Sequence, residues 1–163
     1  MTPRIDIEFN SGAQLPMDAI PDLARMAEAH GFDCAWAGEA NNKDPSVMLA
    51  AIASVTTRLK VGSAIYHILG RTPATLALQS VGLDELSCGR FLLGIGSSNP
   101  TIAQWHGVPF DRPLARVSEY IRVVQTAMAG GKVNFDGIFF SAHGFKMAFK
   151  PFFPSTSSYA FRV

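Results

Sequence analysis

The sequence GRFLLGIGSSN, residues Gly89 to Asn99, carries the clearest structural signal of the chain. Its apolar run from Phe91 to Ile95 is typical of a short strand that is buried on both faces of a parallel sheet. Gly94 and Gly96 interrupt the run, and Pro100 follows at a position where a helix can begin. Because the first backbone N–H groups of a helix lack partners within it, this strand-to-helix turn is predicted to bind an anion or a carbonyl-rich ligand.

Composition and charge narrow the class of protein. The chain has 163 residues, of which 48% are apolar, and this indicates one globular domain with a substantial core. A formal net charge of +1 and scattered basic residues favour neither a nucleic acid nor a membrane surface as partner. Cys34 and Cys88 fit no metal-ligand or CxxC spacing, so we expect reduced thiols in or near the core. No leader peptide and no membrane-spanning run is evident, and the expected location is the cytoplasm.

The chain before Gly89 repeats one pattern, in which a strand is followed by an amphipathic helix. The predicted strands and helices alternate along the sequence, at residues 4–10, 18–30, 32–37, 45–55, 59–66 and 73–86. The three helices have polar N-cap candidates, which are Asp18, Asp44 and Thr72. The helix over 73–86 is almost entirely apolar, which favours burial against the sheet and against a second subunit.

The chain after Asn99 is predicted to begin with a short helical piece that carries Trp105. A long amphipathic helix then follows, with Asp111 as its N-cap. The Asp136-Gly137 pair is typical of a tight hairpin over residues 133–140. From about residue 151 the pattern becomes irregular. The whole of 1–163 is therefore interpreted as part of one domain with an irregular tail.

Several polar residues stand at or just past the carboxyl ends of predicted strands, which is where parallel α/β sheets build their sites. Glu8 and Asn10 would point inward near the end of the first strand if the sheet closes into a barrel. Glu39 follows the second strand and is a candidate acid, base or ligand-binding group, and His67 follows the third strand as a candidate substrate contact. The alternative reading is that these are solvated or ion-paired loop residues.

Four strand-helix units in series predict a parallel α/β sheet. Two ways of completing it are open. An open doubly wound sheet suits the length, whereas a (β/α)8 TIM barrel typically needs about 250 residues, so this chain would supply its first half. A Rossmann dinucleotide fold is disfavoured because its glycine fingerprint belongs to the first strand-helix turn, whereas here the glycines follow the fourth strand.

Most of the chain resembles the luciferase-like superfamily and, within it, the coenzyme F420-dependent oxidoreductases. The segments that carry the resemblance are GFDCAWAGE (31–39), TTRLKVGSAI (56–65), RTP (71–73), LDELSCGRFLLGIGSSNP (83–100), HGVPFDRPLARVSEYIRVV (106–124) and GFKMAFKPFFPS (144–155). The resemblance implies a partial (β/α)8 barrel that binds a deazaflavin ring at its carboxyl-terminal mouth. It also implies hydride transfer between coenzyme F420 and a small-molecule substrate, chemistry that belongs to the coenzyme.

The resemblance also implies roles for residues of this sequence. Glu39 matches a residue near the cofactor ring, Ala64-Ile65 matches a bulge in the third strand that carries a cis peptide in relatives, and residues 96–99 match a loop at the ring edge. Together with the strand-end argument this gives Glu39 and His67 as catalytic candidates and no metal ligand. The cofactor-binding candidates are Asn10, Gly38, Glu39, Ala64, Ile65, Gly96, Ser97, Ser98 and Asn99.

Two departures from the family pattern qualify these roles. Ala40 and Asn99 stand where some relatives carry a histidine and a proton-donating glutamate. The segments for the fifth to eighth strands are absent, and the tail after Ser155 does not match. We therefore expect a truncated or split oxidoreductase, acting as a homodimer or with a second chain that completes the barrel. The alternatives are an FMN-dependent luciferase-like monooxygenase and a noncatalytic remnant or interaction subunit.

Overall fold

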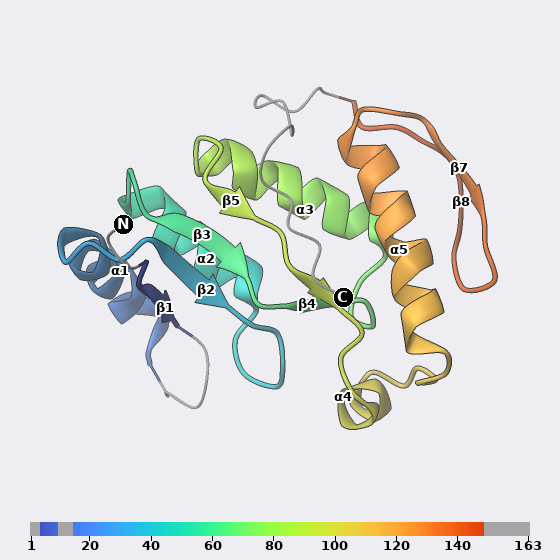
Figure 1. Ribbon diagram of the computed structural model, residues 1–163, viewed down its shortest axis with the longest axis horizontal. Coiled ribbons are helices and arrows are strands. Elements are labelled where there is room, and N and C mark those ends of the chain that lie inside the picture. The colour runs from blue at the N-terminus through green and yellow to red at the C-terminus, as the bar shows by residue number, and fades with distance from the viewer. Residues whose placement is uncertain (1–3, 10–14, 149–163) are drawn as a thin grey trace.

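The computed structural model describes residues 4–9 and 15–148, and its centre is a parallel β-sheet. Four strands pair in the order β1-β2-β3-β5 (Figure 1), and they are β1 (Asp6–Glu8), β2 (Cys34–Ala37), β3 (Lys60–Ser63) and β5 (Phe91–Leu92). Two further strands, β4 (Tyr66–His67) and β6 (Ile95–Gly96), form a separate parallel pair. The predicted parallel α/β architecture is confirmed, and Asn10 and the tail from about residue 151 lie outside the described residues.

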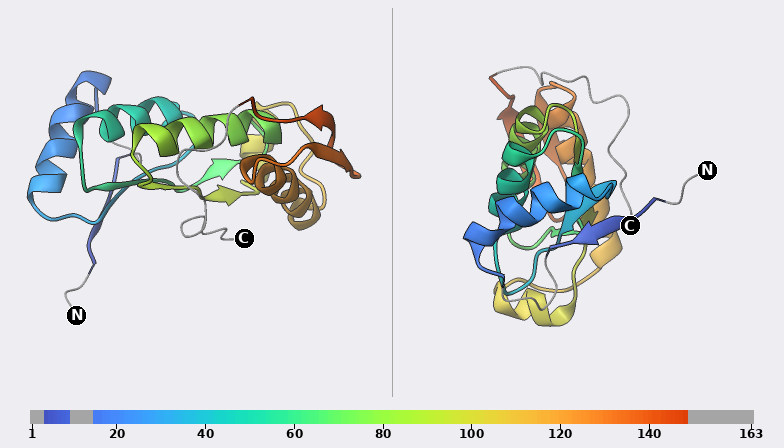
Figure 2. Two further views of the ribbon diagram at one scale, coloured as in Figure 1. Left: turned by 90° about the horizontal axis from the view of Figure 1, so that it is seen from above. Right: turned by 90° about the vertical axis from the view of Figure 1, so that its left-hand side faces the viewer.

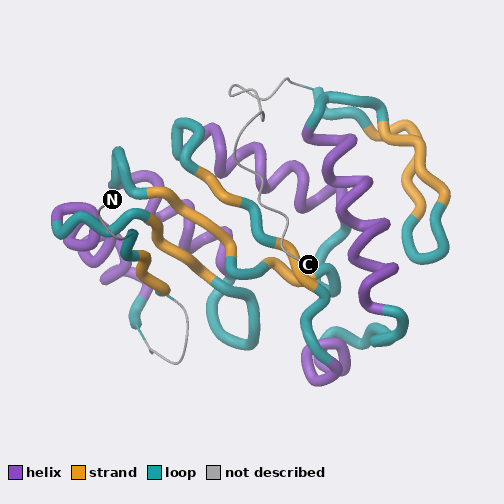
Figure 3. The backbone as a smooth tube through the Cα atoms, in the orientation of Figure 1, coloured by secondary structure: helices purple, strands orange, loops and turns teal. Residues whose placement is uncertain are grey.

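The third and fourth strands of the sequence prediction are each divided into two pieces (Figure 3). The third is divided into β3 and β4 by Ala64 and Ile65, which are joined by a cis peptide bond. The fourth is divided into β5 and β6 next to Gly94, where a Cβ atom would overlap the carbonyl oxygen of Ser63. This close approach of two backbones explains the glycine in the middle of an apolar run.

Helices cover one face of the sheet (Figure 2). They are α1 (Ile20–Ala29), preceded by the 3-10 turn η1 (Met17–Ala19), and then α2 (Pro45–Val55), α3 (Pro73–Leu86) and α5 (Pro113–Met128). Neighbours along this row pack against one another, α1 with α2, α2 with α3, and α3 with α5. Among the described residues, no helix has both the length and the apolar character needed to cross a membrane.

Two of the predicted N-caps are confirmed and two are wrong. Asp44 accepts hydrogen bonds from the first amides of α2, and Thr72 does the same for α3. Asp18 lies inside η1 rather than at the cap of α1. Asp111 forms an ion pair with Arg116, and the cap of α5 is Arg112 in a left-handed conformation. In both cases an extra turn or backbone bend places the helix start one or two residues later than the acidic side chain.

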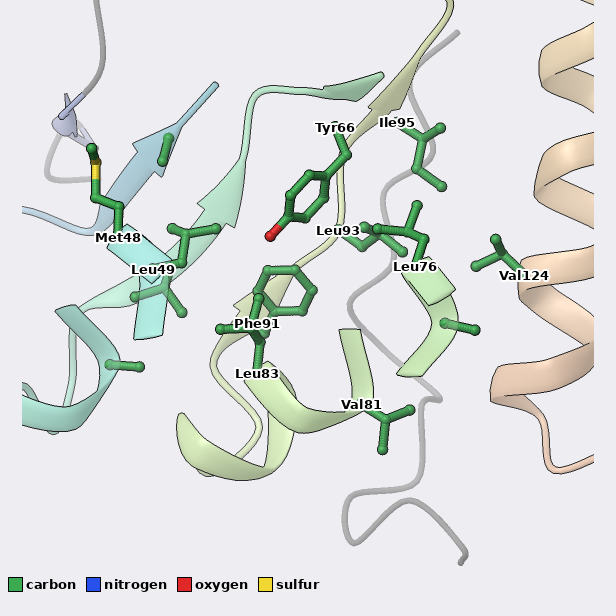
Figure 4. Close-up of a cluster of buried hydrophobic side chains, with 14 of the residues drawn as sticks. Met48, Leu49, Tyr66, Leu76, Val81, Leu83, Phe91, Leu93, Ile95 and Val124 are labelled. Atoms are coloured by element: carbon green, nitrogen blue, oxygen red, sulfur yellow. The ribbon is translucent and has the colours of Figure 1, made fainter. Parts of the chain in front are cut away.

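The hydrophobic core lies between the sheet and the helices. Tyr66, Phe91 and Leu93 from the strands meet Leu76 of α3, and Val124 of α5 closes the cluster (Figure 4). Alternate residues of β2, β3 and β5, namely Ala35, Val61 and Phe91, face the helices and are fully buried. The residues between them, such as Trp36 of β2, face the side of the sheet that α1, α2 and α3 leave uncovered.

The remaining elements are α4 (Pro100–Trp105) and an antiparallel hairpin of β7 (Val133–Asp136) and β8 (Ser141–Phe145) beside α5. The hairpin turn at Asp136-Gly137 is confirmed, although the loop runs over residues 137–140 and the second strand starts later than predicted. The Glu119 carboxylate of α5 accepts hydrogen bonds from three amides of that loop. Cys34 is buried as expected, whereas Cys88 is exposed, because it ends α3 in a left-handed conformation.

Candidate functional site

A cleft of about 710 Å³ lies on the uncovered side of the sheet. It is lined by side chains from β1, β2, β3 and β5 and by the segments that divide the third and fourth strands, namely Arg4, Asp6, Glu8, Asp33, Cys34, Trp36, Lys60, Ser63, Ala64, Ile65, Leu92, Leu93 and Gly94. Its volume falls within the range of small-molecule and cofactor sites. Parallel strands run into it with their carboxyl ends at one rim, which is where such sheets bind ligands.

Ala64 and Ile65 form a bulge at that rim. Ala64 is exposed, and both residues line the cleft. The bulge is tied to the adjacent strand at both ends, since Ala64 N donates to Ala37 O at 2.9 Å and Glu39 N donates to Ile65 O at 3.1 Å. The wall of the cleft is therefore a small side chain and a branched apolar side chain held in place by backbone hydrogen bonds.

Gly96 packs against the bulge, whereas residues 96–99, predicted as cofactor contacts, are not among the residues that line the cleft. A Cβ atom at Gly96 would lie 3.0 Å from Cδ1 of Ile65, so glycine allows the two segments to pack closely. Ser97 and Ser98 are half-buried, and Ser98 has a positive φ of 66°. The Asn99 side chain accepts a hydrogen bond from Ile102 N at 3.1 Å, which confirms the predicted helix start at Pro100.

The Glu39 carboxylate is paired with Arg71, the first residue of the RTP segment. Arg71 Nη1 donates to Oε2 of Glu39 at 2.9 Å, and Arg71 Nη2 lies 2.6 Å from Oε1. The two side chains are only 9% and 11% exposed. The guanidinium also stacks on the ring of Tyr66 and lies 3.4 Å from the carboxylate of Asp44. Such a bidentate pair fixes the direction of the Glu39 carboxylate.

His67 is fully buried within β4, not in a loop past a strand end as predicted. The prediction was wrong because the strand resumes after the bulge. Gly70 N donates to Nδ1 of the imidazole at 3.1 Å, so the proton of the neutral ring lies on Nε2, which is 3.6 Å from Oε2 of Glu39. The ring of His106 packs edge-on against it. Burial lowers the pKa of His67 and outweighs the opposing effect of the Glu39 charge, while His106 and Arg71 lower it further by smaller amounts.

The structure thus divides the predicted site residues into two neighbouring groups. Ala64 and Ile65 line the cleft, whereas Glu39 and His67 form a buried cluster with Arg71, joined to the cleft through the bulge. Gly38 is buried beside Glu39. Among the described residues, no group of three or more histidine, cysteine or acidic side chains is placed to hold a metal ion.

Sequence reasoning missed much of the cleft surface. Trp36 donates its indole N–H to Oδ2 of Asp6 at 3.0 Å, and its ring lies over Gly62, where a Cβ atom would overlap it. Lys60 completes this inward-facing set at the base of the cleft. The available signal was the alternation of residues along the strands, which places Asp6, Trp36 and Lys60 on the face opposite the core.

Comparison with known proteins links this chain to one family. The family model described as luciferase-like monooxygenase matches residues 4–156. Rv3520c of Mycobacterium tuberculosis, named for a proposed coenzyme F420-dependent oxidoreductase activity, is 39% identical over 119 residues, which are 72% of this chain and 34% of that protein.

Two solved structures share the fold. The F420-dependent tetrahydromethanopterin reductase of Methanopyrus kandleri matches 97% of this chain with a TM-score of 0.84 at 23% identity, over 49% of its own length. A type II Baeyer-Villiger monooxygenase from Pseudomonas putida, in complex with FMN, matches 87% with a TM-score of 0.78 at 20% identity, over 44% of its length. The chain therefore spans between a third and a half of the proteins it matches, and its sheet corresponds to part of a (β/α)8 barrel.

Proposed function

The chain belongs to the luciferase-like monooxygenase family, and on that basis we propose that it forms the ring-binding wall of a coenzyme F420-dependent oxidoreductase. The observation that carries the proposal is the cleft of about 710 Å³ whose rim is built by Ala64, Ile65 and Gly94. When bound, the coenzyme would supply the hydride chemistry, while the chain would supply binding and orientation. The substrate is a small organic molecule of a class that this half of the barrel does not select.

The residues at the rim suit a flat, largely apolar ring. Ala64 is small and exposed, so a planar group can approach the backbone closely, and Ile65 offers an apolar surface backed by Gly96. Leu92 extends this apolar wall, and Trp36 also lines the cleft. A pocket of apolar walls with a few fixed polar groups is the usual form of a cofactor site.

Glu39 and His67 would act on the ring through the bulge. The backbone N–H of Glu39 holds Ile65 O, and its carboxylate accepts a hydrogen bond from His67 N at 3.0 Å while paired with Arg71. His67 is neutral at physiological pH because burial lowers its pKa, and its Nε2–H faces Glu39. This cluster would keep a negative charge and a neutral donor fixed behind the wall of the site.

FMN is the second candidate cofactor, because a structure with the same fold is an FMN complex. We favour the deazaflavin because the similar Mycobacterium tuberculosis protein is named for F420 and because GSSNP and VPFDRPLAR resemble the F420-dependent branch. The chain presents four barrel strands, so we propose that the remaining wall comes from further polypeptide, either a second chain or a second copy arranged as a dimer.

The test is a titration of the purified chain with coenzyme F420 and, separately, with FMN. Trp36 lines the cleft and reports binding by its fluorescence, so the titration uses a Trp105→Phe variant that removes the other, exposed tryptophan. We expect saturable binding of F420 that is tighter than binding of FMN. In the same background, Ala64→Phe fills the rim and should abolish binding, whereas Ala115→Phe on the exposed face of α5 should leave it unchanged.

Three outcomes would contradict the proposal. A folded chain that binds neither cofactor would favour the remnant or interaction-subunit alternative, with circular dichroism establishing that the chain is folded. Binding that Ala64→Phe and Ala115→Phe affect equally would place the cofactor somewhere other than this cleft. Tighter binding of FMN than of F420 would select the monooxygenase alternative.

A further inference from the structure

The pairing register between the third strand (β3 and β4) and the fourth strand (β5 and β6) shifts at the bulge. Gly62 pairs with Leu92, and the next pair is Tyr66 with Ile95. Residues 63–65 on one strand therefore face residues 93–94 on the other, which is three residues against two. An extra residue of this kind leaves backbone groups without ladder partners. Something else must satisfy those that are shielded from water, because Ser63 and Leu93 are each only 1% exposed.

The Ser63 side chain takes over the missing ladder bonds. Its hydroxyl accepts a hydrogen bond from Gly94 N at 2.8 Å and donates one to Gly94 O at 2.9 Å. Ser63 is 1% exposed, so water does not compete for these bonds. Gly94 O also accepts from Tyr66 N at 2.9 Å, which starts the second half of the ladder. One hydroxyl thus forms hydrogen bonds with both backbone groups of Gly94, the residue opposite the bulge. We call this pair of hydrogen bonds the clasp.

Gly94 is the necessary partner in this arrangement. A Cβ atom there would overlap the carbonyl oxygen of Ser63, so any other residue would push the strands apart. The clasp and the glycine together set how far Ala64 and Ile65 stand out from the sheet into the cleft. Positions of this sort, behind the wall of a site, decide how accurately the wall is presented.

We infer that Ser63 is a positioning residue that, through its two bonds to Gly94, fixes the Ala64-Ile65 wall against which a planar cofactor ring binds. The role rests on the proposed function of the cleft, and it adds a residue that would act through the bulge. A small hydroxyl suits this place, because it can donate and accept at once from a single atom, whereas alanine leaves Gly94 N without an acceptor.

The chain offers a matched control in Ser87. Its buried hydroxyl also works in both directions, donating to Asp84 O at 3.1 Å and accepting from Arg90 N at 3.2 Å. It is the C-cap of α3, in the turn that leads to β5, and it is not among the residues that line the cleft. Ser63→Ala and Ser87→Ala each remove one donated and one accepted hydrogen bond to the backbone, the first across two strands beside the cleft and the second within the turn between α3 and β5.

The experiment measures amide hydrogen exchange by NMR and cofactor affinity in both variants, with a urea titration showing that each is folded. In Ser63→Ala we expect exchange at Gly94 to be at least about tenfold faster and the dissociation constant for F420 to rise about tenfold. In Ser87→Ala we expect faster exchange at Arg90, a similar loss of stability and an unchanged dissociation constant. A purely structural role for Ser63 would weaken stability in both variants and affinity in neither.

Two results would overturn the inference. One is exchange at Gly94 that Ser63→Ala leaves at the wild-type rate. The other is wild-type affinity for F420 in a folded Ser63→Ala variant whose Gly94 exchanges faster. If the wild-type chain binds neither F420 nor FMN, the proposed function fails and the ring-positioning role fails with it. The exchange rate at Gly94 would then still decide whether the clasp exists, so the two failures are distinguishable.

Discussion

Arg71 connects more of the site than any motif in the sequence indicates. Its guanidinium holds Glu39 after β2, contacts Asp44 at the cap of α2 and stacks on Tyr66 of β4. Its backbone carbonyl accepts a hydrogen bond from the Tyr120 hydroxyl of α5. A charge this buried is stable only while its partner is present, because each ion alone would carry an uncompensated desolvation cost.

Removal of the Arg71 guanidinium is predicted to destabilise the folded protein. Arg71→Met should lower the free energy of unfolding by about 3 kcal/mol or more, because Glu39 is left as an unpaired buried charge. Glu39→Gln combined with Arg71→Met should lose less than the sum of the two single changes by at least about 1 kcal/mol. Urea denaturation of the four proteins at neutral pH measures this coupling. Strictly additive losses would show that the pair is not an energetic unit.

Residue-level prediction from the sequence was uneven for a physical reason. Glu39 could be singled out because it follows a buried strand, and that signal is local. Its partner Arg71 lies 32 residues away and meets it only through the fold. His67 was misplaced because the bulge adds a residue to the third strand, and no periodicity of apolar side chains reveals such an addition.

At the scale of elements, the amino-terminal end of the sheet is built for stability. Arg90 donates to the backbone carbonyls of Ala53, Thr56 and Leu59, so it fastens β5 to the end of α2. The Glu28 carboxylate of α1 accepts hydrogen bonds from the amides of Thr57, Arg58 and Leu59. These hydrogen bonds lie at the end of the sheet opposite the carboxyl-terminal rim of the cleft. In (β/α)8 barrels, likewise, the amino-terminal face contributes to stability and the carboxyl-terminal face holds the active site.

The Glu28 contacts predict a specific pH dependence. Burial raises the pKa of this carboxyl, but the hydrogen bonds from Leu59, Arg58 and Thr57 outweigh it, so the pKa lies below its usual value. A lowered pKa in the folded state stabilises the protein above the unfolded pKa of about 4.3, and this gain is lost as the pH falls through the folded value. Glu28→Gln should therefore cost about 1–2 kcal/mol at pH 7 and progressively less below about pH 4.

The matching measurement is urea denaturation between pH 7 and pH 3, with Glu85→Gln as control because Glu85 is exposed on α3. The difference between wild type and Glu28→Gln should shrink with falling pH, while the control stays near wild type throughout. A difference that persists unchanged at pH 3 would mean that the carboxylate charge is not what holds this loop.

The starts and ends of the helices show which element boundaries can be predicted from the sequence. The span of α3, residues 73–86, was predicted correctly because Thr72 and Pro73 mark its start and the apolar pattern marks its end. The starts of α1 and α5 were predicted too early because the acidic residues before them satisfy other partners or lie within a turn. Caps that depend on a single side chain are predictable only when no tertiary contact competes for it.

At the scale of the whole molecule, the sheet is covered on one face by helices of the described residues, 4–9 and 15–148. Its other face presents Asp6, Trp36, Lys60 and Leu92, a mixture of charged and apolar side chains. Parallel sheets are normally covered on both faces, and in barrels the inward face is closed by the remaining strands. The open face is thus the part of the molecule that further polypeptide is expected to cover.

This expectation predicts self-association of the purified chain. Sedimentation velocity at micromolar concentration should show a species larger than the 17.6 kDa monomer. Leu92→Asp on the open face should shift the equilibrium towards monomer, whereas Leu114→Asp on the exposed start of α5 should not. A wild-type chain that sediments only as monomer would argue against a second copy as the covering partner.

A planar cofactor that binds against the bulge between β3 and β4 would change the surroundings of the amides there. An NMR titration of the ¹⁵N-labelled chain with coenzyme F420 measures this, because each amide reports its own surroundings. We expect saturable shifts at residues 63–66 and 94–96, with the amides of Thr57, Arg58 and Leu59 at the opposite end of the sheet unchanged. Shifts confined to other surfaces, or none at saturating F420, would contradict binding at the bulge.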